Sequence, residues 1–124
     1  MVFKTAKEFD VDFVANEDFN LQNLETINNT IDTFMSKVDK VHVTIDLDGF
    51  SSAYAPGVSA ASPMGFSPDI ALKSLHKIIK SEKLISLDLA EYNPKYDRDN
   101  QTAKLASSLI HFILYNHNSL QINT

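Results

Sequence analysis

The chain has 124 residues, a formal net charge of −5 and 44% hydrophobic residues, which is typical of a soluble globular protein with one domain. The acidic balance, with no cluster of Lys or Arg, argues against a nucleic-acid surface. The absence of cysteine excludes disulfides, thiolate metal sites and cysteine nucleophiles. No apolar stretch reaches membrane-spanning length and no secretory signal is present, so we expect a cytoplasmic protein without a membrane partner.

Strand-like and helix-like segments alternate along the chain. The apolar run 11–14 predicts a short strand, and apolar residues at steps of three and four predict a helix over 21–38. The run 41–47 predicts a second strand, followed by a Gly- and Pro-containing loop over 49–66. Ser67 and Pro68 have the residue types of an N-cap and a first helical position. A third strand over 84–90 and a last helix over 101–115 complete the series.

This alternating order predicts an α/β fold in which a parallel sheet is flanked by helices. Ligands of such sheets bind beyond the carboxyl ends of the strands. Chemistry-bearing residues at those ends are therefore the first candidates for a site.

Three acidic residues lie at the predicted strand ends. Asp46 and Asp48 close the strand 41–47, where alternation puts both on one face with Cα atoms roughly 6.5 Å apart. Glu91 follows the strand 84–90 directly, so it is expected at the same edge of the sheet. Neighbouring carboxylates repel each other unless a proton or cation neutralises them, and hard cations such as Mg²⁺ and Mn²⁺ favour oxygen ligands. The pattern predicts part of a metal site.

Other interpretations of these residues remain open. Asp46 and Asp48 are also typical of polar residues in a solvent-exposed loop, and Glu91 taken alone is typical of a residue that caps a turn. Asp97, Asp99 and Thr102 are interpreted as capping residues of the last helix. His42 lies roughly 13 Å along the strand from Asp46, too far to share a metal, and is interpreted as a packing histidine.

Two sequence blocks resemble the ureohydrolase family, which comprises arginases, agmatinases and formimidoylglutamases. Residues 44–66 resemble its third metal-binding signature, with Asp46, Asp48, Pro56, Gly57 and Gly65 at matching spacing. Residues 87–106 resemble its Glu-x-Asn-Pro stretch and the following helix, so the resemblance covers about residues 10–115. Ser52 stands where many arginases and agmatinases have Pro, and with the run 55–60 it resembles formimidoylglutamases more closely.

The resemblance implies a three-layer α/β/α arginase-like fold, with residues 1–124 as its C-terminal portion. It implies that Asp46 bridges two Mn²⁺ ions, that Asp48 binds one of them and that Glu91 binds the amidine or guanidine end of a small-molecule substrate. The implied reaction is hydrolysis of a C–N bond, with N-formimidoyl-L-glutamate, an intermediate of histidine metabolism, giving glutamate and formamide. Arginase or agmatinase activity is the alternative, and a homo-oligomer is compatible with the resemblance.

Two further metal-binding stretches of the family, Gly-Gly-Asp-His and Asp-Ala-His-x-Asp, do not occur in the sequence. They normally lie upstream, so no catalytic set is complete here and we expect the chain alone to be inactive. A non-catalytic truncated homologue is therefore a second hypothesis. A third is a haloacid-dehalogenase-type phosphatase, whose first motif resembles Asp-Leu-Asp-Gly, although Phe50 stands where that motif has Thr and the expected later acidic pair is missing.

Overall fold

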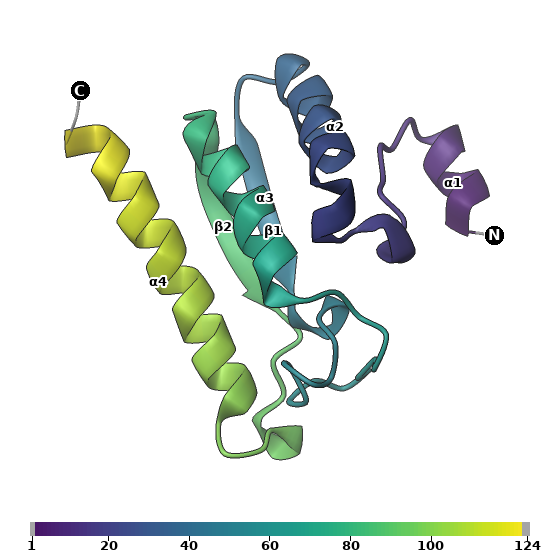
Figure 1. Cartoon of the computed structure of the whole chain (residues 1–124), viewed down its shortest axis with the longest axis vertical. Helices are drawn as coiled ribbons and strands as arrows, with labels where there is room; N and C mark the ends of the chain where they lie inside the picture. Colours follow the sequence, from purple (N-terminus) through teal and green to yellow (C-terminus); the bar gives the residue numbers. More distant parts are fainter. Residues whose placement is uncertain (1, 123–124) are drawn as a thin grey trace.

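A two-stranded parallel sheet forms the centre of the computed structural model, which describes residues 2–122 and the side chains of residues 4–118. β1 (Val41–Asp46) pairs with β2 (Leu84–Ala90) in a register that puts Asp46 opposite Ala90. Because the strands are parallel, their carboxyl ends lie at one edge of the sheet. Figure 1 shows the long loops that follow both strands gathered at that edge.

Helices cover one face of this sheet. The helices of the described chain are α1 (Val2–Glu8), α2 (Leu24–Ser36), α3 (Pro68–Lys80) and α4 (Gln101–Ile122). α3 contacts both α2 and α4 and lies in front of the strands in Figure 1. In the core, alternate side chains of the strands pack against these helices. It includes Ile45, Leu84, Leu75, Ile79, Leu109 and Ile113.

The other face of the sheet is exposed and polar. His42 and Thr44 of β1 and Ser86 and Asp88 of β2 all have exposed side chains. Both strands are also edge strands within the described part of the chain. The structure thus contains the sheet and a helical layer over one of its faces.

Local sequence explains where α3 begins and ends. Ser67 occupies the N-cap position and Pro68 the first turn, as predicted. The Ser67 hydroxyl hydrogen-bonds to the Asp69 carboxylate, and Asp69 accepts from the backbone N–H of Ile70 at 2.7 Å. Asp69 in the first turn and Lys77 and Lys80 in the last turn complement the helix dipole.

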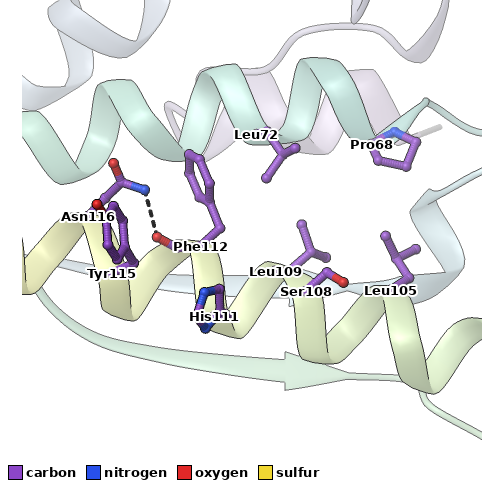
Figure 2. A pocket seen from close by; sticks show the side chains of 9 residues that line it. All are labelled: Pro68, Leu72, Leu105, Ser108, Leu109, His111, Phe112, Tyr115 and Asn116. Atoms are coloured by element: carbon purple, nitrogen blue, oxygen red, sulfur yellow. Dashed lines mark hydrogen bonds between the residues drawn. The ribbon is translucent and has the colours of Figure 1, made fainter.

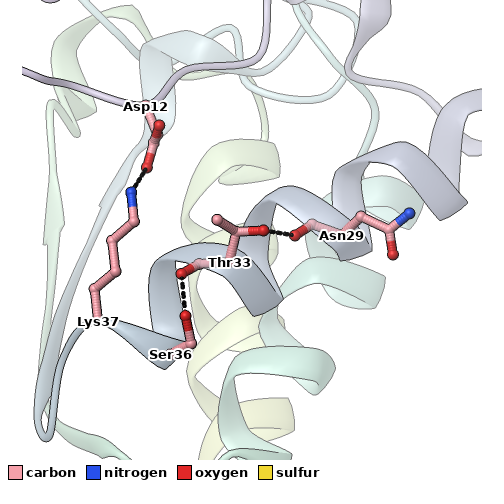
Figure 3. Close-up of polar contacts among 5 residues, drawn as sticks. All are labelled: Asp12, Asn29, Thr33, Ser36 and Lys37. Atoms are coloured by element: carbon pink, nitrogen blue, oxygen red, sulfur yellow. Dashed lines mark hydrogen bonds and ion pairs between the residues drawn. The ribbon is translucent and has the colours of Figure 1, made fainter.

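The predicted strand over 11–14 is wrong, because this segment has no regular secondary structure. Val11 and Phe13 are 53% and 47% exposed, so the apolar run lies on the surface. Figure 3 shows how the segment is attached instead: Lys37, just after α2, contacts Asp12 with a distance of 3.2 Å between Nζ and Oδ2. An apolar run of four residues forms a strand only where a neighbouring strand pairs with it.

The helix boundaries also differ from the predictions. A 3₁₀ turn at Leu21–Asn23 precedes α2, which ends at Ser36 rather than at residue 38. α4 continues beyond residue 115 to Ile122, and α1 was not predicted. None of the described helices is long and apolar enough to cross a bilayer.

An apolar groove of about 460 Å³ runs between α3 and α4. Figure 2 shows that α3 contributes Leu72, while most of the lining comes from α4, including Leu105, Leu109 and Phe112. The groove lies between the two helices and contains none of the acidic residues singled out in the sequence.

Candidate functional site

Asp46 and Asp48 lie next to each other at the carboxyl end of β1. β1 ends at Asp46, and Leu47–Gly49 forms a 3₁₀ turn. The Asp46 carboxylate accepts a hydrogen bond from the backbone N–H of Asp48 at 3.2 Å. The two aspartates are neighbours, as expected, but the expected reason is wrong. They do not alternate along one strand, because Asp48 belongs to a turn that Asp46 caps.

The structure brings Glu91 close enough to this pair for their charges to interact. The pKa of Asp48 is raised above its ordinary value by partial desolvation, by a side-chain hydrogen bond with Asp46 and by repulsion from Asp46 and Glu91. Three carboxylates from the ends of two strands thus share one edge of the sheet. Their repulsion is the kind that a bound cation relieves.

The backbone of Glu91 is unusual. Its φ is +67°, in the left-handed region that residues with a Cβ rarely adopt. Such a conformation costs roughly 1–3 kcal/mol and persists only when the surrounding structure enforces it, which occurs most often at functional sites. The sequence placed Glu91 at the site, but nothing in the sequence indicated this conformation.

The loop after Asp48 is held by its own backbone. Phe66 N donates to Gly49 O at 3.0 Å, Ser51 N to Phe66 O at 2.9 Å and Ser52 N to Ser62 O at 2.8 Å. At Gly65 a Cβ would clash with backbone atoms of Gly49 and Phe50. The loop is therefore an ordered structure that requires glycine at this close approach.

Gly57 connects this loop to the segment after Glu91. Its N–H donates to Thr102 Oγ1 at 2.7 Å, and its carbonyl accepts from Asn93 N at 2.8 Å. A Cβ on Gly57 would lie 2.7 Å from Cβ and Cγ of Asp97, so no larger residue fits. We call Gly57, Asn93, Asp97 and Thr102 the Gly57 junction.

Asp97 organises the start of α4. Its carboxylate accepts from the backbone N–H groups of Arg98, Thr102 and Ala103 at 2.9, 3.0 and 3.1 Å, and from the Tyr92 hydroxyl at 3.2 Å. Desolvation acts to raise the pKa of Asp97, but the backbone N–H and hydroxyl of Thr102 and the backbone N–H groups of Ala103 and Arg98 lower it to about 2. The capping interpretation of Asp97 is confirmed. The contact of Thr102 with Gly57, across 45 positions, was not foreseen.

A polar cavity of about 420 Å³ opens between the two loops. Its walls come from segments that follow Asp48 and Glu91 and carry the polar groups of Ser52, Ser59, Tyr96 and Arg98. Asp46 borders a second, mostly apolar pocket of about 300 Å³ beside β1, which also contains Ser74. Within the described residues the buried Ser74 hydroxyl has no hydrogen-bond partner.

His42 is separate from the acidic site. Its side chain lies on the exposed face of the sheet, with Nδ1 2.7 Å from Ser86 Oγ and Nε2 3.3 Å from Asp88 Oδ2. Both ring nitrogens have partners, as expected of a satisfied histidine, but the expected packing is wrong, because this face has no layer over it in the described chain.

The described residues do not form a complete metal site. Across residues 2–122 no group of three or more His, Asp or Glu has the geometry to hold a metal ion. Asp46 and Asp48 offer two adjacent carboxylates, which fit a hard cation by ligand type but not by number. Further ligands would have to come from outside this part of the chain.

Comparison with known proteins identifies the fold. A sequence model of the arginase family matches residues 2–115. The formimidoylglutamase of Bacillus subtilis subsp. subtilis str. 168 superposes with a TM-score of 0.83 at 22% identity, over 92% of this chain and 36% of that one. The arginase of Entamoeba histolytica, solved in complex with L-ornithine, superposes with a TM-score of 0.77 at 25% identity, over 88% and 37%.

A curated relative supports the same family. The formimidoylglutamase of Staphylococcus aureus (strain JH9) is 40% identical over 113 residues, which cover 91% of this chain and 36% of that protein. The chain thus spans little more than a third of the length of this relative. Since the family match covers nearly all of its residues, the chain belongs to the arginase family and adopts part of the arginase-like α/β fold.

Proposed function

We propose that this chain is the C-terminal portion of a Mn²⁺-dependent ureohydrolase domain that hydrolyses a C–N bond of an amidine or guanidine. The observation that carries the proposal is the convergence of Asp46, Asp48 and Glu91 at the carboxyl ends of two parallel strands. Ligands of α/β sheets bind at this edge. Family membership supports the reaction class and leaves no support for the phosphatase alternative.

Each acid has a proposed role that suits its chemistry. Asp46 would bridge two metal ions and Asp48 would bind one, because carboxylate oxygens are preferred ligands of hard divalent cations. The chemistry that such a metal pair supplies when bound is water activation near neutral pH. Glu91 would accept hydrogen bonds from the cationic amidinium of the substrate, since charge-assisted hydrogen bonds are strong and directional.

The missing ligands would come from a segment that this chain does not include. The chain covers 36% of the curated relative, and both strands of its sheet have a free edge within the described residues. The exposed polar face of the sheet is a further surface that additional chain would cover. We therefore expect the isolated chain to be catalytically inactive.

The activity assay compares the isolated chain with a longer protein. Pure 124-residue chain with excess Mn²⁺ is incubated with N-formimidoyl-L-glutamate, arginine and agmatine. We expect no turnover, whereas a longer protein that carries the remaining ligands should hydrolyse one of the three. Turnover by the pure chain would overturn the proposed incompleteness, and an inactive longer protein that binds Mn²⁺ would favour the non-catalytic hypothesis.

N-formimidoyl-L-glutamate is the substrate we favour. The 40% identity to a formimidoylglutamase and the sequence around Ser52 and 55–60 support it over arginine and agmatine. In the longer protein we expect kcat/KM to be highest for N-formimidoyl-L-glutamate. Higher values for arginine or agmatine would assign the protein to another branch of the family.

A further inference from the structure

We propose that Thr102 and Asp97 are positioning residues for Glu91, acting through the Gly57 junction. They hold the loop after Asp48 against the segment after Glu91, so that the Glu91 carboxylate stays beside the acid pair. This inference rests on the proposed role of Glu91 as the substrate-binding carboxylate.

The contacts form a continuous path from α4 to Glu91. Thr102 is 0% exposed, and its Oγ1 accepts from Gly57 N at 2.7 Å. The carbonyl of Gly57 in turn accepts from Asn93 N at 2.8 Å, and Asn93 lies two residues after Glu91. A buried hydrogen bond is costly to lose, so Thr102 fixes the position of Gly57 and, through it, of Asn93.

The residue between Glu91 and Asn93 is held by the same junction. The Tyr92 hydroxyl donates to Asp97 Oδ2 at 3.2 Å, and Asn93 Nδ2 lies 3.2 Å from Ser59 Oγ in the opposite loop. Both residues that follow Glu91 are therefore tied to fixed partners. This is the surrounding constraint that the left-handed backbone of Glu91, with φ of +67°, requires.

Helix capping alone does not account for the junction. The start of α4 uses the bonds from Thr102 N and Ala103 N to Asp97. The Thr102 hydroxyl donates to the Asp97 carboxylate, but as an acceptor it binds Gly57 N in another loop and satisfies no N–H of α4. The Tyr92–Asp97 contact likewise adds nothing to the helix. These two contacts serve the relative placement of the loops.

The test compares two variants of the 124-residue chain with the unmodified chain by NMR. Thr102→Val keeps the side-chain volume and removes the hydroxyl that accepts from Gly57 N and donates to Asp97, and Thr102→Ser is the matched control that keeps this hydroxyl. In the Val variant we expect hydrogen exchange of the Gly57 amide to accelerate by about tenfold or more, the effect of losing a buried hydrogen bond. Glu91 should also lose the chemical shifts of a positive φ, while exchange of amides inside β1 and β2 is retained.

The Ser variant should behave like the unmodified chain. Unchanged Gly57 exchange and unchanged Glu91 shifts in Thr102→Val would overturn the proposal. If Thr102→Val does not fold, Tyr92→Phe decides, because it removes a single hydroxyl from a partly exposed ring. We then expect the Glu91 shifts to move in Tyr92→Phe, and unmoved shifts would overturn the proposal.

A second readout separates this inference from the proposed function. Formamidinium serves as the probe, and the side-chain carboxyl shift of Glu91 is followed during its titration. We expect a response in the unmodified chain and in Thr102→Ser, a weaker one in Thr102→Val and none in Glu91→Gln. An equal response in Thr102→Val overturns the positioning role alone. No response in the unmodified chain contradicts the substrate-binding role of Glu91 and, with it, the functional meaning of the junction.

Discussion

Two aspartates of this chain have opposite electrostatic surroundings. Asp48 faces Asp46 and Glu91, and desolvation and these neighbours raise its pKa. Asp97 accepts from backbone N–H groups and from the Thr102 hydroxyl, which outweigh desolvation and lower its pKa to about 2. Carboxylates surrounded by donors stabilise a fold, whereas crowded carboxylates store repulsion that a ligand can relieve. We therefore expect Asp97 to stabilise the structure around the candidate site and Asp48 to bind a ligand in it.

The depressed pKa of Asp97 predicts a pH dependence of stability. Its folded pKa of about 2 lies below the ordinary value of 3.8, so its contribution is fully present above pH 3.8 and is lost as the pH falls through 2. Asp97→Asn should lower the free energy of unfolding at pH 7 by about 1 kcal/mol, because hydrogen bonds to a charged acceptor are stronger than those to a neutral amide. Urea unfolding from pH 7 to pH 2 should show the two proteins converging at the acid end. A constant difference would contradict the assignment.

In a longer protein that binds metal, removing the carboxylate of Asp48 and removing that of Glu91 should have different effects on metal content and on activity. Asp48→Ala should reduce bound Mn²⁺ and activity together, because it removes a proposed ligand. Glu91→Ala should retain the metal and weaken substrate use, seen as a fall in kcat/KM by about 10²-fold if a charge-assisted hydrogen bond is lost. Metal content by elemental analysis and steady-state kinetics check both. Equal metal loss in the two variants would show that Glu91 has been assigned the wrong role.

At the scale of elements, two of the three glycines in the loop over 49–66, Gly65 and Gly49, should tolerate an added Cβ to different degrees. At Gly65 an added Cβ meets backbone atoms of Gly49 and Phe50, which cannot move independently of the loop. At Gly49 the Cβ meets the ring of Phe66 at 2.7 Å, and a ring can rotate. Gly65→Ala should therefore cost more stability, about 1–3 kcal/mol, than Gly49→Ala. Chemical denaturation checks the order, and a larger loss for Gly49→Ala would contradict it.

Local signals predicted most elements, and tertiary contacts decided the rest. β2 and the start of α3 follow directly from an apolar run and from Ser67 and Pro68. The run 11–14 has the same kind of signal but lacks a strand to pair with in the described chain. Residue type and strand order were enough to predict that Asp48 and Glu91 lie together. The contact between Thr102 and Gly57 depends on two loops meeting across 45 positions, and no local pattern records it.

At the scale of the whole molecule, charge and apolar surface are unevenly distributed. The net charge is −5, yet Lys104 is the only Asp, Glu, Lys or Arg between residues 101 and 118. On the outer side of α4, Ile110 and Leu114 are 42% and 57% exposed. An apolar helix face with almost no charge lacks the repulsion that keeps surfaces apart. In the isolated chain this face is therefore open to a second copy.

We expect the isolated chain to self-associate through α4 as its concentration rises. Ile110→Glu with Leu114→Glu should shift sedimentation velocity profiles toward monomer, because both substitutions replace exposed apolar side chains by charges. Gln22→Glu with Asn29→Glu is the matched control, since it adds the same charge at exposed positions outside α4 without removing apolar surface. If the control variant dissociates as completely as the first, net charge governs association and not the apolar face. A chain that stays monomeric at every concentration would contradict self-association through any surface.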